Sequence, residues 1–134
     1  MKKLLLAFTL LTTVVVGQNP AEALRLVKDG VKMHDANMLE EAIKLYEEAL
    51  KVDKNNYLAL SEIAMTYSQL GDYKKAIAYC ELAIKTNPKE DLRYTYVTYA
   101  NSFDHLKDSK KAIATYNKAI NLYPDFYQLY FNRG

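Results

Sequence analysis

Two histidine–aspartate neighbours are the first candidates for chemistry in this 134-residue sequence. His34 precedes Asp35, and His105 follows Asp104, so each pair combines an imidazole with a carboxylate. Adjacent residues in a helix do not face each other, so neither pair is suited to pass a proton between its members. We therefore expect both histidines to be surface residues without an acid–base role.

Paired carboxylates at positions 40–41 and 47–48 raise the possibility of hydrolytic chemistry, which often uses two acidic groups. Lysine follows glutamate at a spacing of four, however, which predicts a solvated helix face with ion pairs. The pairs expected on this basis are Glu40–Lys44, Glu47–Lys51 and Glu81–Lys85. The sequence also contains no zinc-type His/Cys spacing and no glycine-rich loop before a helix. We therefore expect no enzyme, no metal site and no cofactor.

Cys80 is the only cysteine, so the chain cannot form an internal disulfide. It lies between Ile77 and Ala83 in an apolar helical register. A lone cysteine in such a register is typical of a small buried side chain, and we expect no redox or metal role.

The charge balance excludes one class of function. The sequence has 18 lysines and arginines against 16 aspartates and glutamates, for a net charge of +2. A nucleic-acid-binding protein normally carries a clear basic excess, so we expect no nucleic-acid partner. The low counts of glycine (4) and proline (3) also argue against an all-β fold, which needs many turns.

The first residues resemble a secretory signal peptide. Lys2 and Lys3 precede an uncharged apolar run from Leu4 to Val16, which is short beside the ~20 residues of a membrane span. The sequence predicts residues 1–17 as a signal peptide cut before Gln18, and hence an exported protein, periplasmic or secreted, of a Gram-negative-type bacterium. A retained membrane anchor and a buried first helix remain as alternatives.

The rest of the chain, residues 18–134, repeats itself. Ala42 and Ala76 are 34 positions apart, and Ala76 and Ala112 are 36 apart, each within a similar five-residue stretch. The same steps relate a second set of small residues, Gly30, Ala64 and Ala100. A period of this length predicts a stacked array, because one unit cannot bury its apolar face alone.

Each unit is expected to form two helices, as in residues 57–70 and 73–86. Asp72 is a candidate N-cap for the second of these, and Pro88 ends it. Asn19–Pro20 is the matching start of the first unit. The prediction is therefore an all-α fold, an α-solenoid of antiparallel helix pairs, with units at about 23–56, 57–92 and 93–126 and a partial unit at 127–134. Helical register assigns Tyr67, Tyr96, Tyr99, Tyr116 and Tyr130 to the core and leaves Tyr94, Tyr123 and Tyr127 free.

This pattern resembles the tetratricopeptide repeat. The residues that carry the resemblance are Leu60-x-x-Ile63-Ala64-x-x-Tyr67 with Ala76 and Pro88, and Tyr96-x-x-Tyr99-Ala100-x-x-Phe103 with Ala112 and Pro124. The first unit departs from the pattern at Asp29 and Lys54, as terminal repeats often do. The fourth unit stops within its first helix, so we expect the sequence to be a fragment of a longer protein.

The resemblance implies a concave groove, lined by the first helix of each unit, that holds a peptide. Carried over by register, the groove residues are Leu24, Val27, Val31, Leu58, Glu62, Met65, Gln69, Tyr94, Val97, Thr98 and Asn101. Ser61 and Ser68 interleave with them as neutral hydrogen-bonding groups. Cochaperones of this family clamp an acidic tail with cations and amides, at places that hold Val27, Val31, Glu62, Tyr94 and Thr98 here. None of these five is a cation, so the resemblance does not extend to that subclass.

The expected function is a non-catalytic protein–protein interaction scaffold of the bacterial envelope, binding a peptide segment in the groove. One alternative is the sensor portion of a longer envelope signalling protein whose catalytic domain lies beyond residue 134. A third reading is an envelope-assembly module with a lipid or glycan ligand. The partner is a protein or peptide of unknown identity, and membrane contact is expected only through an uncleaved signal segment.

Overall fold

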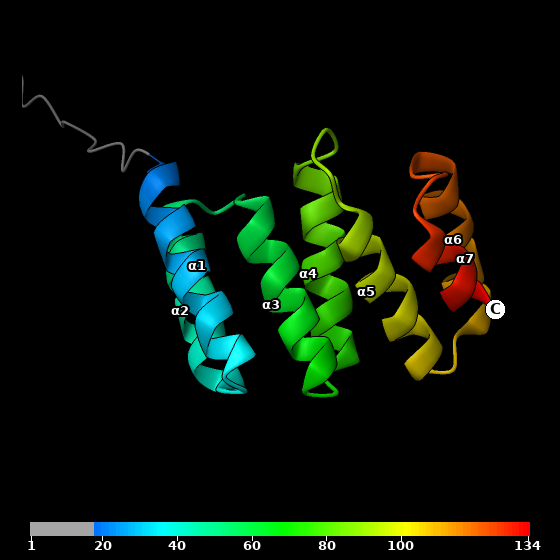
Figure 1. The fold of residues 1–134 in the computed structure, drawn as a ribbon, viewed down its shortest axis with the longest axis horizontal. Coiled ribbons are helices and arrows are strands. Elements are labelled where there is room, and N and C mark those ends of the chain that lie inside the picture. The colour runs from blue at the N-terminus through cyan, green and yellow to red at the C-terminus, as the bar shows by residue number, and fades with distance from the viewer. Residues whose placement is uncertain (1–17) are drawn as a thin grey trace, which may run out of the picture.

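The computed structural model describes residues 18–134, and the predicted signal peptide at residues 1–17 lies outside the described residues. The described chain forms seven helices, arranged in a row from α1 and α2 at one end to α6 and α7 at the other (Figure 1). They are α1 (Pro20–Asp35), α2 (Leu39–Val52), α3 (Tyr57–Gln69), α4 (Tyr73–Thr86), α5 (Arg93–His105), α6 (Ser109–Leu122) and α7 (Tyr127–Arg133). The prediction of an all-α solenoid is confirmed.

Side-chain caps begin four of the seven helices, α1, α3, α4 and α6, and those of α1 and α4 are at the predicted residues. The Oδ1 of Asn19 accepts a hydrogen bond from the Glu22 amide at 3.1 Å, with Pro20 at the first helical position of α1. Asp72 and its repeat equivalent Asp108 cap α4 and α6 in the same way, each at 3.2 Å. Each cap satisfies one amide that has no partner within its helix, which fixes where the helix starts.

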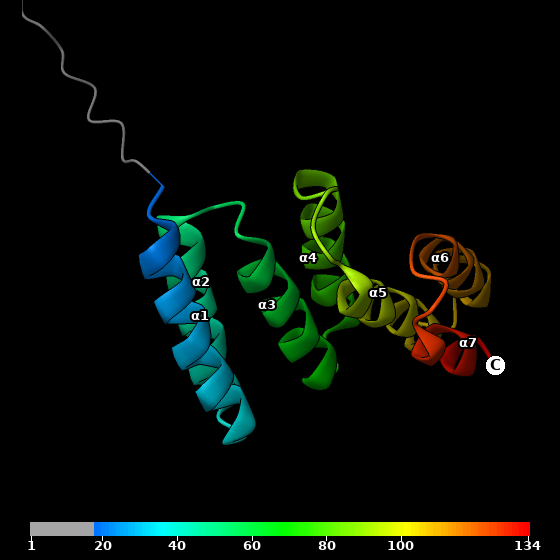
Figure 2. The ribbon, with the colours of Figure 1, turned by 45° about the horizontal axis from the view of Figure 1, so that its top comes forward.

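The helices form antiparallel pairs, α1 with α2, α3 with α4 and α5 with α6. The first helices of successive units also contact one another, α1 with α3, α3 with α5 and α5 with α7. The second helices α2, α4 and α6 make no such contacts within residues 18–134. The stack therefore curves with the odd-numbered helices on its inner face, and successive pairs rotate along it (Figure 2).

Small residues lie where the helices cross most closely. Ala42 and Ala76 are fully buried, and Ala112 is 3% exposed. Gly30 is under the tightest restriction, because an added Cβ would lie 2.5 Å from Cε1 of Tyr46. The in-phase small residues are thus crossing positions, as the period predicts.

Cys80 is buried, as predicted, and its thiol lies 3.5 Å from the carbonyl oxygen of Thr95. Burial raises the pKa of the Cys80 thiol far above its ordinary value, because the thiolate would lose its hydration. The thiol therefore stays protonated and unreactive, and Cys80 serves packing between α4 and α5.

Two tyrosine predictions are wrong. Tyr130 is 40% exposed, because Leu129, one residue earlier, fills the core position of α7. Tyr123 is partly buried, and its hydroxyl oxygen accepts a hydrogen bond from the Leu92 amide at 3.0 Å. Tyr94 and Tyr127 are exposed as predicted.

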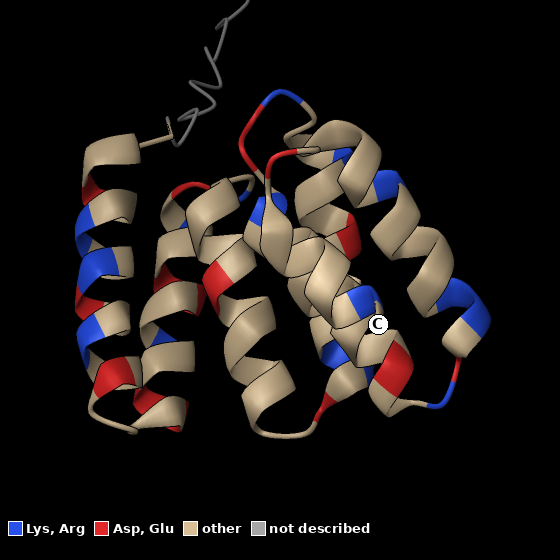
Figure 3. Cartoon of the chain, turned by 45° about the vertical axis from the view of Figure 1, so that its right-hand side comes forward, with Lys and Arg blue, Asp and Glu red and all other residues tan. Residues whose placement is uncertain are grey.

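Charged positions of both signs are interspersed along the ribbon (Figure 3). The predicted glutamate–lysine pairs at positions 40–44, 47–51 and 81–85 are absent from the ion pairs of the described chain. Arg25 instead bonds Glu22 at 2.7 Å and Asp29 at 3.1 Å, and Asp29 also bonds Lys32 at 2.9 Å. This ladder explains why Asp29 departs from the repeat pattern: it lies on a solvated face of the terminal helix.

Candidate functional site

A hollow of about 310 Å³ lies on the inner face of the stack, between α3, α5 and α7. Its lining residues are Met65, Ser68, Gln69, Tyr94, Val97, Thr98, Asn101 and Gln128. Seven of these were predicted as groove residues from register. We call this hollow the inner groove.

The apolar part of the inner groove comes from residues of very different exposure. Tyr94 is 66% exposed, and its ring packs edge-on against Phe126 with centroids 5.1 Å apart. Met65 is 37% exposed, whereas Val97 is only 7% exposed and belongs to the core beneath. A ligand can therefore contact Met65 and Tyr94 broadly but reaches only the edge of Val97.

The polar part of the inner groove is neutral. It consists of the hydroxyls of Ser68 and Thr98 and the amides of Gln69, Asn101 and Gln128. The Tyr116 hydroxyl donates a hydrogen bond to Oδ1 of Asn101, which leaves the Asn101 amide nitrogen available as a donor to the groove. Burial, helped by the Asp104 carboxylate, raises the pKa of Tyr116 to about 12, so this hydroxyl keeps its proton at neutral pH.

The remaining predicted groove residues lie outside the inner groove. Val27 is only 4% exposed and is part of the core, so a ligand cannot reach it. Val31 and Leu58 are partly buried and pack against the same core cluster, while Leu24 is 39% exposed. The structure thus keeps the α1 positions apart from the lined hollow between α3, α5 and α7.

Glu62 lies in a polar cluster near the C-terminal end of α1. Burial raises the pKa of the Glu62 carboxyl; His34 opposes this and Asp35 adds to it. The His34 side chain is 16% exposed, its Nδ1 lies 3.8 Å from Oδ1 of Asp35, and its Nε2 is buried with no hydrogen-bond partner in the described chain. The prediction of a surface histidine is therefore wrong for His34. It holds for His105, which is exposed and stacks on Tyr73 at 4.4 Å.

Gln128 is the one lining residue that sequence reasoning missed. It lies 34 positions after Tyr94, so the repeat period places it in the same register. Extending the register into the partial unit would have identified Gln128.

Metal and membrane features are not found in the part of the chain that the structure describes. Over residues 18–134, no three His, Cys, Asp or Glu side chains gather in a way that could hold a metal ion. Each helix in that range is too short or too polar to span a membrane. The inner groove is an open surface with apolar side chains and neutral hydrogen-bonding groups.

Comparison with solved structures shows the same fold. The first tetratricopeptide repeat domain of Spaghetti (RPAP3), bound to the HSP90 peptide SRMEEVD, matches with a TM-score of 0.80 and 22% identity over 86% of this chain and 90% of that one. The second such domain of human RPAP3, in complex with the HSP70 peptide SGPTIEEVD, has a TM-score of 0.78 and 20% identity over 86% and 95%. The Sgt2 domain from Aspergillus fumigatus has a TM-score of 0.74 and 27% identity over 83% and 72%.

Sequence comparison agrees with the fold. The small glutamine-rich tetratricopeptide repeat-containing protein of Dictyostelium discoideum is 32% identical over 81% of this chain, and the match spans 32% of that protein. Matches to the cell division cycle protein 27 homolog A of Arabidopsis thaliana and to tetratricopeptide repeat protein 14 of Mus musculus each span 14% of the relative. The chain thus covers a third or less of these relatives. Family models described as tetratricopeptide repeat match residues 33–98 and 94–126, and the chain belongs to the tetratricopeptide repeat family.

Proposed function

We propose that this chain is a non-catalytic protein–protein interaction scaffold that binds a peptide segment in the inner groove. The observation that carries the proposal is the hollow of about 310 Å³ lined by the first helices of successive units. Apolar contact with Met65 and Tyr94 would anchor a side chain of the ligand, while neutral amides and hydroxyls would bond its backbone.

The proposed ligand is a segment of low charge. The related RPAP3 domains were solved with peptides that end in EEVD, an acidic sequence. In this chain, the positions matched by register to the acidic-tail clamp hold Val27, Val31, Glu62, Tyr94 and Thr98. None offers a positive charge to a carboxylate, and Glu62 would repel one when ionised. An apolar anchor flanked by neutral residues fits this surface better.

The proposed setting is the bacterial envelope, reached through residues 1–17 as a cleaved signal peptide. Support comes from Lys2 and Lys3 followed by the apolar run to Val16. Expression in a Gram-negative host should give a periplasmic protein whose first residue, by N-terminal sequencing, is Gln18. A cytoplasmic protein that still begins at Met1 would remove this part of the proposal.

The sensor portion of a longer envelope signalling protein is a second candidate. The observation that favours it is that the chain covers only a third or less of its first curated relatives. Sequencing of the full gene would decide for it by revealing a catalytic domain downstream. The third reading, an envelope-assembly module with a lipid or glycan ligand, would instead require binding of such a molecule to the inner groove.

A selection from a random peptide library tests the main proposal. Peptides that bind the parent chain should carry apolar anchors with few charges. Met65→Asp should weaken the affinity for these peptides about ten-fold or more, because it places a charge in the groove. Met38→Asp is the matched control, because Met38 is similarly exposed (43%) but lies outside the inner groove. Selected peptides with acidic ends, or equal binding by both variants, would contradict the proposal.

A further inference from the structure

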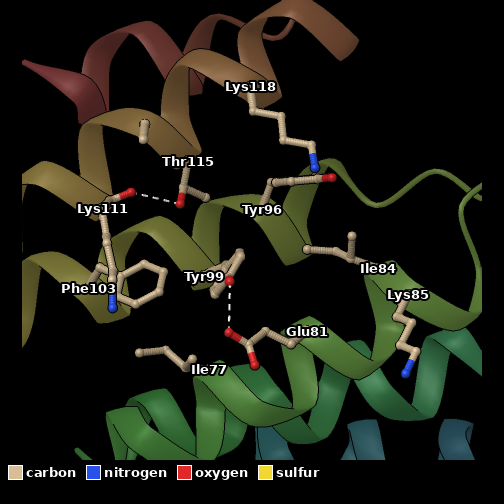
Figure 4. Close-up of a pocket in the computed structure, with 11 residues that line it drawn as sticks. Ile77, Glu81, Ile84, Lys85, Tyr96, Tyr99, Phe103, Lys111, Thr115 and Lys118 are labelled. Carbon is tan, nitrogen blue, oxygen red and sulfur yellow. Dashed lines mark hydrogen bonds between the residues drawn. The ribbon is translucent and has the colours of Figure 1, made fainter.

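The outer face of the stack holds a larger hollow, of about 690 Å³, between α4 and α6. Aromatic side chains of α5 form its floor, with Tyr99 and Phe103 at the centre and Tyr96 toward one end (Figure 4). Ile77 and Ile84 line it from α4. We call this hollow the outer groove; it shares no residue with the inner groove.

Comparison of successive units explains why the outer groove is open. In the preceding unit, the rings of Tyr67 and Tyr79 stack at 5.7 Å and cover the equivalent place beside α2. A step of 36 residues takes Tyr67 to Phe103 but takes Tyr79 to Thr115. Because threonine is much smaller than tyrosine, a hollow remains open beside Thr115, although Phe103 itself packs against Tyr99 and beneath Lys111 and is only 8% exposed.

The lysine–ring contacts beside Tyr67 in the second unit repeat beside Phe103 in the third unit. The Nζ of Lys75 lies 5.0 Å from the centre of the Tyr67 ring, and that of Lys111 lies 5.5 Å from the centre of the Phe103 ring. Lys75 and Lys111 are themselves 36 residues apart. The change from tyrosine to threonine at position 115 therefore opens a groove in an otherwise conserved arrangement of helices.

The rim of the outer groove is positively charged. Lys85 comes from α4, while Lys111 and Lys118 come from α6, whose ribbon shows positive positions only (Figure 3). Within residues 18–134, neither Lys85 nor Lys118 lies within 4.0 Å of a carboxylate, whereas Lys111 is 3.6 Å from Asp108. The one carboxylate of the lining, Glu81, accepts a hydrogen bond from the Tyr99 hydroxyl at 2.9 Å.

We propose that the outer groove binds an acidic peptide segment that places one large apolar side chain beside Thr115 and carboxylates against Lys85 and Lys118. The hollow beside Thr115, lined by Tyr99 and by Ile77 and Ile84 of α4, provides the contact for the apolar side chain. Lys85 on α4 and Lys118 on α6 lie on opposite walls of the outer groove, near its Tyr96 end, so two separate anionic groups are needed to pair with both (Figure 4). A peptide with acidic residues flanking an apolar one meets this requirement, whereas a fatty acid carries a single carboxylate.

The experiment uses the 134-residue chain and a fluorescent five-residue peptide, with phenylalanine between two pairs of acidic residues. Fluorescence anisotropy should show binding that is about ten-fold weaker when alanine replaces the phenylalanine, and weaker still when basic residues replace the acidic ones. Raising the salt concentration from about 0.05 to 0.5 M should weaken binding of the acidic peptide, because its ion pairs are exposed.

Two kinds of variant test the site itself. Thr115→Tyr restores the residue of the preceding unit, so it should fold and should reduce peptide binding about ten-fold by filling the hollow beside position 115. The double variant Lys85→Glu with Lys118→Glu should also reduce binding of the acidic peptide, because the new carboxylates repel those of the peptide. Lys74→Glu with Lys110→Glu is the matched control, since these lysines lie on the same two helices but outside the lining.

The outcomes separate this proposal from that for the inner groove. Met65→Asp should leave binding of the acidic peptide unchanged, whether or not the inner groove binds peptides. The proposal would be overturned if the parent and Thr115→Tyr bound the acidic peptide equally. It would also be overturned if the groove variant (Lys85→Glu with Lys118→Glu) bound it as well as the control variant (Lys74→Glu with Lys110→Glu). It would also be overturned if laurate displaced the peptide at lower concentration than unlabelled peptide does, because the groove would then be a fatty-acid site. If Thr115→Tyr does not fold by circular dichroism, the lysine variants still decide.

Discussion

Three turn residues adopt the same left-handed backbone conformation in the three units. Asn37 has φ 60°, Gly71 has φ 82° and Lys107 has φ 63°. Each turn closes the helix before it with its own amide, as Lys107 does by donating to the Asp104 carbonyl at 2.9 Å. Glycine adopts this conformation without penalty and asparagine tolerates it, but a lysine Cβ is strained there. Lys107 is therefore a position of local strain.

Lys107→Gly should raise the free energy of unfolding by about 0.5–1 kcal/mol, because the turn needs a positive φ. Urea denaturation with helical circular dichroism measures the change. The control is Glu48→Gly at an exposed position inside α2, where the same replacement should cost about 0.5–1 kcal/mol. A loss of stability in both variants would show that Lys107 is not strained.

Gly30 is restricted by space and not by backbone conformation. In a helix interior, Gly30→Ala would ordinarily gain about 1 kcal/mol of helix propensity. Here the new methyl group would lie 2.5 Å from the ring of Tyr46, which is fully buried and has no room to move aside. Overpacking of this kind costs about 1–3 kcal/mol, so the net effect should be destabilising.

A double-mutant cycle checks the cause. Tyr46→Leu alone should destabilise the chain by leaving a cavity, but Gly30→Ala on that background should cost less than it does on the parent. If the changes in unfolding free energy of the two single variants add up to the change of the double variant, the Tyr46 ring is not what restricts Gly30.

At the scale of the elements, the place where α1 and α3 meet carries a titratable group. Burial raises the pKa of Glu62 above its ordinary value, with His34 and Asp35 as the charges that act on it. The folded chain therefore holds this proton more tightly than the unfolded chain does. The resulting stabilisation is present below the ordinary carboxyl pKa and is lost as the pH rises through the raised folded value.

Glu62→Gln removes this ionisation while keeping a similar shape. The variant should match the parent near pH 4, where both side chains are neutral, and should become progressively more stable than the parent as the pH rises toward 7. Urea denaturation across this range measures the difference. Glu48→Gln at an exposed site is the control, and a difference for Glu62→Gln that does not change with pH would contradict the burial argument.

The helices themselves were predictable because local signals and the repeat agree. The range predicted as 73–86 is the observed α4, since Asp72 caps its start and its alanines recur in phase. The final helix was less predictable. In α7, Leu129 and not the in-phase Tyr130 is buried, because only α5 and α6 pack against this helix in the described chain.

The inner groove was predictable in part. Register alone placed Met65, Gln69 and Asn101 on the inner face, where they line the hollow, because the first helices of successive units contact one another. Register could not predict that Val27 is buried, since the burial of a side chain depends on how closely its helix packs against the neighbouring helices. The outer groove could not be found this way, because Thr115 is informative only once the Tyr67–Tyr79 stack is seen.

At the scale of the whole molecule, α5 joins the two grooves. Val97, Thr98 and Asn101 line the inner groove, while Tyr99 and Phe103, from the same helix, line the outer one. The two proposed sites therefore lie on opposite sides of one helix and share no lining residue. Because their linings differ in charge, neutral on one side and basic on the other, the two proposals predict different ligands.

The same neighbour-to-neighbour contacts determine how instability spreads through the chain. The core forms one cluster around α1, α2 and α3 and another around α5, α6 and α7. Helix α1 contacts α2 and α3 but, among the described residues, makes no contact with α5 or α6. In a stack of this kind, stability is a sum of unit and interface contributions, so a local defect should act mainly on its neighbours.

Gly30→Ala should therefore speed amide hydrogen exchange most in α1 and α2, less in α3, and little in α5 and α6. Lys107→Gly should act at the other end and slow exchange in α5 and α6, because it relieves strain in the turn between them. Exchange followed by mass spectrometry in mild urea resolves each helix. If Gly30→Ala instead sped exchange equally in all seven helices, the chain would unfold as a single cooperative unit, and the picture of separable neighbours would fail.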